Sequence, residues 1–103
     1  MPKVFVVQDP GLKDISDAKK FGKLDIVTTY ADYRNPLEFI IDKIHEKLSS
    51  YKTSDYILLI GNPIAIGITM TIAAENSEDG HVKLLVWDKK NHRYEEKGVR
   101  IWK

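Results

Sequence analysis

Two short apolar runs, each closed by a turn signal, constrain the fold of this chain more than any other feature. The first run is Val4–Val7, which stops at the turn sequence Gln8–Gly11. The second run is residues 55–60, which stop at Gly61–Pro63. Strands without polar alternation are typical of parallel sheets that are covered on both faces. The sequence therefore predicts a parallel sheet with these two runs as central strands.

The clearest helical pattern follows Asn35. This residue suits an N-cap, Pro36 suits the first helical position and Glu38 suits the N3 position. The apolar residues that follow have helical spacing and form one stripe: Leu37, Ile40, Ile41, Ile44 and Leu48. The pattern predicts a helix over residues 36–50.

A second helix is predicted over residues 64–74, which are apolar almost throughout. Asn62 is placed to cap this helix and Pro63 to begin it. A helix that is apolar on all sides is normally buried. We therefore expect it to pack directly on the sheet.

The remaining segments complete the sheet. Residues 24–30 are predicted as an edge strand, and residues 12–23 as a polar surface excursion. Residues 81–88 and the segment from residue 93 form a hairpin, with Gly98 marking a bulge. Strands that alternate with helices predict a single α/β domain over residues 1–103. We expect a small Rossmann-like sandwich with a mostly parallel sheet of four to five strands, a C-terminal antiparallel hairpin and two main helices.

The composition excludes several kinds of chemistry. The 103 residues include no cysteine, which excludes disulfides, thiolate metal sites and a cysteine nucleophile. No apolar run approaches the ~20 residues that a membrane span needs. The strand-like start of the chain, Met1–Val4, does not resemble a signal peptide. We expect a soluble, intracellular protein with no membrane association.

Charge is distributed unevenly, although the net charge is only +1. Residues 1–24 carry +2, residues 25–80 carry −5 and residues 81–103 carry +4. The candidate contact residues of the basic, aromatic hairpin are Lys83, Lys89, Lys90, His92, Arg93, Tyr94, Arg100 and Trp102. Such residues suit nucleic acid, because aromatic rings stack on bases and cations meet phosphates. A protein partner, a subunit contact through Trp102 and a merely solvated hairpin are the alternatives.

A candidate ligand site lies where the two predicted central strands end. Ligands of open α/β sheets bind beyond the carboxyl ends of the parallel strands, and helix N-termini suit phosphate or carboxylate. The candidate ligand-binding residues at this end are Gln8, Asp9, Gly11, Gly61 and Asn62. The same sequences are also good turns and caps that need no ligand. No catalytic motif and no metal-ligand spacing is present, so we assign no catalytic residue, metal or cofactor.

Three segments resemble a family of short proteins from tailed bacteriophages. Residues 55–67 are similar to its strand-Gly-Asp/Asn-Pro-helix segment, and residues 80–88 are similar to its G-x-V-K-L-L-x-W-D segment. Residues 4–10 resemble its N-terminal strand. The segment of residues 12–35 is shorter than the corresponding segment of the family and shares little with it. The resemblance implies a viral origin and expression in the host cytoplasm, with virion association left open. It transfers no catalytic residue.

Three hypotheses for function follow. The leading one is a phage accessory protein that binds a host or phage protein without catalysis, because small phage proteins often act on replication or transcription machinery. Exposed strand edges also predict a homodimer. The alternatives are nucleic-acid binding through the hairpin, and binding of a small ligand or nucleotide at the carboxyl ends of the strands.

Overall fold

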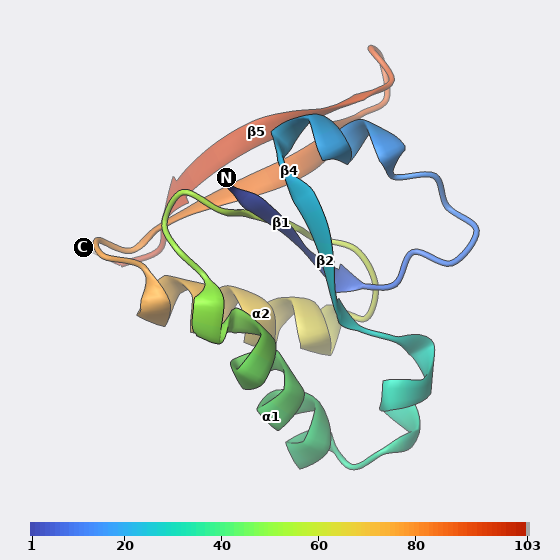
Figure 1. The fold of residues 1–103 in the computed structure, drawn as a ribbon, viewed down its shortest axis with the longest axis vertical. Helices are drawn as coiled ribbons and strands as arrows, with labels where there is room; N and C mark the ends of the chain where they lie inside the picture. The colour runs from blue at the N-terminus through green and yellow to red at the C-terminus, as the bar shows by residue number, and fades with distance from the viewer. Residues whose placement is uncertain (103) are drawn as a thin grey trace.

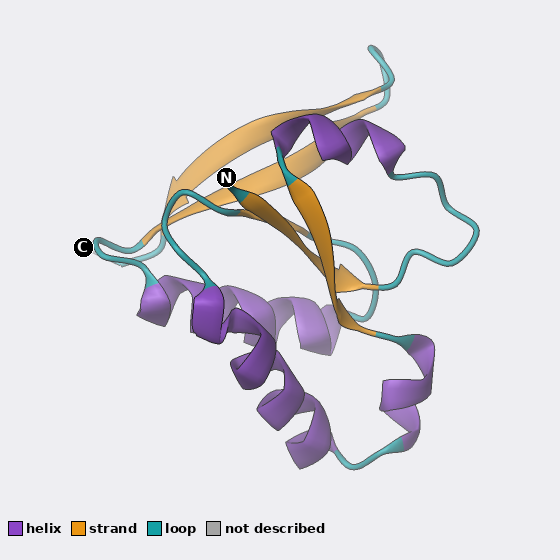
Figure 2. Ribbon diagram, viewed as in Figure 1, coloured by secondary structure: helices purple, strands orange, loops and turns teal. Residues whose placement is uncertain are grey.

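Five strands form one sheet in the order β2-β1-β3-β4-β5 in the computed structural model, which describes residues 1–102. Figures 1 and 2 show the sheet with its helices. The strands are β1 (Lys3–Gln8), β2 (Lys23–Thr28), β3 (Tyr56–Leu58), β4 (His81–Asp88) and β5 (Arg93–Arg100). The first four run parallel, and β5 runs antiparallel to β4. The predicted α/β fold, with a mostly parallel sheet and a C-terminal hairpin, is confirmed.

Both main helices lie on the same face of the sheet (Figure 1). They are α1 (Leu37–Lys47) and α2 (Pro63–Asn76), and the 3₁₀ turn η3 (Leu48–Ser50) extends α1. The 3₁₀ helix η1 (Ser16–Phe21) covers the other face, and η2 (Tyr30–Arg34) joins β2 to α1. Because η1 is a single short element, the second helical layer of a Rossmann sandwich is absent among residues 1–102. The Rossmann-like description stays a prediction.

The two faces of β1 belong to two separate apolar clusters. Phe5 and Val7 lie in the larger cluster, which includes the buried side chains of α1 and α2. Val4 and Val6 lie in the smaller cluster, which includes Ala18 of η1. The run Val4–Val7 is fully buried, which explains why it lacks polar alternation.

Four local predictions were wrong. Asn35 does not cap α1, because its side-chain amide donates instead to the carbonyl of Asp32, and Pro36 occupies the cap position. The predicted strand at residues 24–30 ends at Thr28, and the run at residues 55–60 forms a strand only over Tyr56–Leu58. Gly98 lies opposite Lys83 in an unbroken register, so there is no bulge.

Candidate functional site

The chain leaves β1 and β3 over opposite faces of the sheet, although these two strands are neighbours. From β1 it passes to η1, and from β3 it passes to α2 on the other side (Figure 1). Such a topological switch point opens a crevice at the carboxyl ends of the two strands. The predicted ligand residues Gln8, Gly61 and Asn62 lie in this crevice, where they line a hollow of about 380 Å³ together with Tyr30 and Tyr33.

Gln8 bridges the crevice. Its side-chain oxygen accepts a hydrogen bond from the backbone N–H of Asn62 at 2.8 Å, and the Gln8 side chain is buried. Gly61 has a φ of +109°, and a Cβ at this position would lie 2.4 Å from the Gln8 side chain. Only glycine therefore permits this close approach. The structure brings together three of the five predicted ligand residues.

The helix terminus beside the crevice is already capped. The side-chain oxygen of Asn62 accepts a hydrogen bond from the Ile64 N–H at 2.8 Å, which confirms Asn62 as the N-cap of α2. Pro63, the first residue of the helix, has no N–H to offer. Two donors at the helix start, the N–H groups of Asn62 and Ile64, are thus bonded within the chain. An anion at this position has fewer free donors than the sequence pattern suggests.

Asp9 and Gly11 lie outside the hollow. The Asp9 carboxylate accepts a hydrogen bond from the Gly11 N–H at 2.9 Å, and Gly11 has a φ of +64°. The Asp9 N–H donates to the carbonyl of Thr28 at 2.8 Å. These contacts form a tight turn after β1, which is the alternative that the sequence left open.

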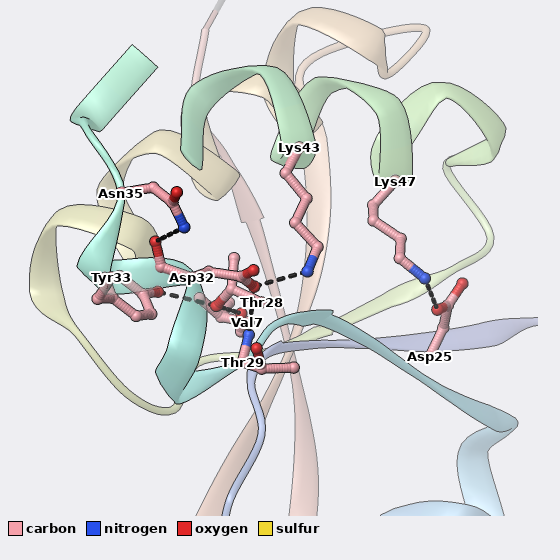
Figure 3. Close-up of polar contacts among 9 residues, drawn as sticks. All are labelled: Val7, Asp25, Thr28, Thr29, Asp32, Tyr33, Asn35, Lys43 and Lys47. Carbon is pink, nitrogen blue, oxygen red and sulfur yellow. Dashed lines mark hydrogen bonds and ion pairs between the residues drawn. The ribbon is translucent and has the colours of Figure 1, made fainter. Parts of the chain in front are cut away.

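Tyr30 and Tyr33, which the sequence analysis did not identify, reach the hollow from η2. The hydroxyl of Thr28 donates to the Val7 carbonyl at 2.6 Å, and it lies 2.8 Å from the Tyr33 hydroxyl (Figure 3). Because the single hydroxyl proton of Thr28 is used, the Tyr33 hydroxyl is the donor in the second contact. This chain of bonds fixes the Tyr33 ring against the end of β1.

An ion pair between the buried carboxylate of Asp32 and the partly exposed Lys43 anchors η2 to α1. The Asp32 carboxylate accepts from the Lys43 ammonium and from the Thr29 N–H, each at 2.6 Å (Figure 3). Burial on its own raises the pKa of Asp32, but these two hydrogen bonds outweigh burial and hold that pKa below its ordinary value. Asp32 is therefore ionised at neutral pH and has a structural role.

Large apolar side chains surround the mouth of the crevice. A second hollow, of about 220 Å³, adjoins the first and shares Tyr33 and Asn62 with it. The exposed fractions around the two hollows are 82% for Tyr30, 57% for Ile64 and 47% for Leu37. We call Tyr30, Tyr33, Leu37 and Ile64 the end surface. Leu37 begins the predicted apolar stripe of α1 but is exposed and lies outside the core. An apolar residue beyond those that the core needs was the sequence signal that could have indicated the end surface.

The eight predicted hairpin residues do not form one surface. Strand alternation places Lys83, Tyr94 and Arg100 on the face that η1 covers, and Arg93 on the opposite face. Tyr94 is buried, with its ring centroid 4.9 Å from that of Trp87. The remaining candidates are the turn residues Lys89, Lys90 and His92, and Trp102 near the chain end.

Trp102 packs on its own chain. Its indole N–H donates to the carbonyl of Ala74 at 2.9 Å, at the C-terminal end of α2. A Cβ on Gly80 would lie 2.8 Å from the indole ring, so this glycine permits the ring to approach. The contact fastens the end of the chain to the helical face.

The described residues define a small α/β domain with a mostly parallel sheet, a switch-point crevice and an exposed apolar end surface. The chain belongs to the Phage Pam3 gp32-like protein family, whose sequence model matches residues 2–101. The predicted membership in a phage protein family is confirmed. No curated protein and no solved structure matches the chain. Across residues 1–102, no helix is long and apolar enough to cross a membrane, and no cluster of side chains suits a metal ion.

Proposed function

We propose that this phage protein is a non-enzymatic binding module that docks a host or phage protein on its end surface. Replication or transcription machinery is the class of target that its small size and viral origin favour. The observation that carries the proposal is the group of large, exposed apolar side chains around two adjoining hollows: Tyr30, Leu37 and Ile64.

Apolar side chains that are grouped and exposed favour burial by a partner. Isolated exposed apolar residues are common on monomers, but a contiguous group beside a hollow is typical of an interaction site. Tyrosine is also enriched among the residues that contribute most to protein interfaces. The side-chain amides of Asn35 and Asn62 line the second hollow and can bond a partner's backbone.

The chemistry of the two hollows favours a protein over a nucleic acid. Their lining consists of tyrosines, amides, aliphatic residues and one glycine, and includes no charged side chain. Phosphates would therefore meet no cation there, whereas nucleic-acid affinity comes mainly from such contacts. The lining also offers no carboxylate or imidazole for acid–base catalysis, which supports a binding role.

Nucleic-acid binding remains the second candidate because of the hairpin turn. Lys89, Lys90 and His92 are exposed at the tip of the hairpin, and the His92 ring lies 6.4 Å from the Trp87 ring. This aromatic pair beside two lysines could stack on a base while the ammonium groups meet phosphates. A small ligand or nucleotide in the switch-point hollow is the third candidate, since the hollow lies where α/β sheets bind such ligands.

The test is affinity capture from host and infected-cell lysates, with and without nuclease, using the wild type and three variants. The double variant Tyr30→Ser/Ile64→Ser removes two apolar groups of the end surface. Leu12→Ser is the matched control, because Leu12 is fully exposed on the loop after β1. The triple variant Lys89→Ala/Lys90→Ala/Arg93→Ala removes hairpin cations.

We expect a defined protein that survives nuclease, is retained by Leu12→Ser and the triple variant, and binds the end-surface variant at least about tenfold more weakly. Equal capture by the wild type and the end-surface variant would refute the proposed surface. If nuclease treatment abolishes the recovery of captured proteins, and the triple variant also fails to capture them, nucleic-acid binding would be favoured instead. A thermal shift with nucleotides that Gln8→Ala removes would favour the small-ligand candidate.

A further inference from the structure

The outer edge of β5 is open over only part of its length. In an antiparallel ladder, alternate residues direct both backbone groups toward the neighbouring strand or away from it. The Ile101 N–H donates to the Gly80 carbonyl across the hairpin, whereas the Tyr94 N–H points outward to Asp17. Even-numbered residues of β5 therefore direct their N–H and C=O groups away from β4.

Asp17 closes one end of this edge. Its carboxylate, at the start of η1, accepts the Tyr94 N–H at 2.7 Å. Tyr94 is thereby unable to pair with a further strand. The open part of the edge consists of Glu96, Gly98 and Arg100, all of which are exposed.

The side chains along the open edge are complementary to themselves. Glu96 and Arg100 project from the same face, with Gly98 midway between them. When two copies of β5 pair antiparallel about a two-fold axis at Gly98, each Glu96 lies directly opposite Arg100 of the other copy. Opposite charges at directly opposed positions stabilise a strand pair. Neither side chain makes an ion pair within residues 1–102. Hydrogen bonds from His81 hold the pKa of the Asp79 carboxyl below its ordinary value, and the charge of Arg100 adds a smaller contribution.

Other two-fold registers are less favourable. An axis at Lys97 would oppose Tyr94 to Arg100 and would need the N–H that Asp17 already holds. An axis at Val99 would oppose each Arg100 to Gly98 and each Glu96 to Trp102, whose indole is bonded to Ala74, so no opposite charges would face one another directly. Diagonal like charges occur in both registers, at Arg100 and at Lys97 respectively, and do not separate them. The axis at Gly98 is therefore the register that directly opposes Glu96 to Arg100.

We propose that the β5 edge pairs with a second copy of this chain, antiparallel and centred on Gly98, to form a continuous ten-stranded sheet across the dimer. The three open residues of each copy would supply roughly six intermolecular hydrogen bonds. The open edge and the end surface have no residue in common. The inference therefore does not rest on the proposed function, and each can fail alone.

Charge reversal tests the register. The oligomeric state of the full chain would be measured by sedimentation equilibrium at low salt for the wild type, Glu96→Arg, Arg100→Glu and the variant that carries both changes. Glu75→Arg, on the exposed face of α2, is the control for the altered net charge. We expect a wild-type dimer with a Kd in the micromolar range, which is typical of a small interface.

Each single reversal converts two attractive contacts into two repulsive ones, so we expect a dimer about 10- to 100-fold weaker. The variant with both changes should recover to within about threefold of the wild type, and Glu75→Arg should match the wild type. A wild type that stays monomeric to about 500 µM overturns the proposal. A wild-type dimer that the single reversals leave unchanged, or that the variant with both changes fails to restore, overturns it as well.

Gly98→Pro tests the edge itself. The Gly98 N–H faces outward and does not bond to β4, so this edge strand can accommodate a proline at position 98. The substitution removes a hydrogen-bond donor at the centre of the proposed strand pair. We expect a folded monomer by circular dichroism and sedimentation. A folded Gly98→Pro variant that dimerises as tightly as the wild type overturns the proposal. If proline prevents folding, the charge reversals still decide the question.

Discussion

The switch-point crevice and the β5 edge differ in which chemical groups remain exposed after folding. In the crevice, Gln8 and Asn62 satisfy the nearest backbone donors, and apolar side chains remain exposed around them. At the edge, the side chains are charged and the backbone groups of Glu96, Gly98 and Arg100 point outward. The first surface suits burial by an apolar partner, whereas the second suits pairing with another strand. Gln8 and Asn62, which the sequence suggests as ligand-binding residues, thus already make hydrogen bonds within the chain.

The largest expected difference between the two regions concerns a buried charge. Lys43→Met keeps most of the side-chain stem but leaves the Asp32 carboxylate without its cation. We expect the free energy of unfolding to fall by about 2–3 kcal/mol, because the buried Asp32 carboxylate loses its cation, although Lys43 itself is partly exposed. Lys97→Met on the exposed β5 strand is the control and should change it by less than about 0.5 kcal/mol. Urea denaturation measures both, and similar losses for the two variants would contradict the structural role of the pair.

The two glycines at the centres of these regions should respond differently to alanine. Gly61→Ala combines a φ of +109° with a Cβ 2.4 Å from the Gln8 side chain, so we expect a loss of about 2 kcal/mol. At Gly98, a Cβ meets nothing within 4 Å, so Gly98→Ala should leave monomer stability equal or slightly higher. Thermal unfolding of both variants at low protein concentration separates these outcomes. A Gly61→Ala protein as stable as the wild type would show that the crevice can widen.

The hydrogen bond across the crevice should have a smaller effect. Gln8→Met fills a similar volume but leaves the Asn62 N–H without its acceptor, so we expect a loss of about 1–2 kcal/mol. Lys97→Met is again the control, because it introduces methionine at an exposed position without removing a buried acceptor. Chemical denaturation should rank the wild type and Lys97→Met above Gln8→Met. Equal stability of Gln8→Met and the wild type would mean that water replaces the lost acceptor.

The smallest expected effect is a change in acid sensitivity. The pKa of Asp32 lies below its ordinary value of 3.8 in the folded protein, so its ionised form stabilises the fold. That contribution is complete above the unfolded-state pKa and disappears as the pH falls through the lower folded-state pKa. Asp32→Asn should therefore flatten the loss of stability below about pH 4. Unfolding curves between pH 2 and about 6 would check this, and an unchanged slope would exclude Asp32 as a contributor.

The sequence predicted the elements that depend on residues within one short segment. Val4–Val7 shows its two-sided burial directly, and Asn62 with Pro63 caps α2 as its residue types indicate. The cap at Asn35 was wrong because η2 bonds that side chain to the Asp32 carbonyl, and η2 itself is held by the distant Lys43. No short sequence window contains that contact.

The candidate site was predicted only in part for the same reason. Gln8 and Asn62 are 54 positions apart, and the parallel pairing of β1 with β3 brings them together as the fold class implied. Tyr30 and Tyr33 reach the hollow only because a 3₁₀ turn replaces the end of the predicted strand. The hairpin cations looked continuous in the sequence, but strand alternation divides them between two faces.

The contact between Asp17 and Tyr94 makes local unfolding of η1 a threat to solubility. η1 holds only a few apolar side chains against its face of the sheet, and short elements of this kind open more readily than the core. Opening would free the Tyr94 N–H, lengthen the unprotected edge and uncover the buried side chains of Val4, Val6 and Leu85. A longer, more apolar edge is a template for uncontrolled aggregation. One carboxylate on η1 thus limits the length of the open β5 edge, and amide hydrogen exchange at Tyr94 would report how often that contact opens.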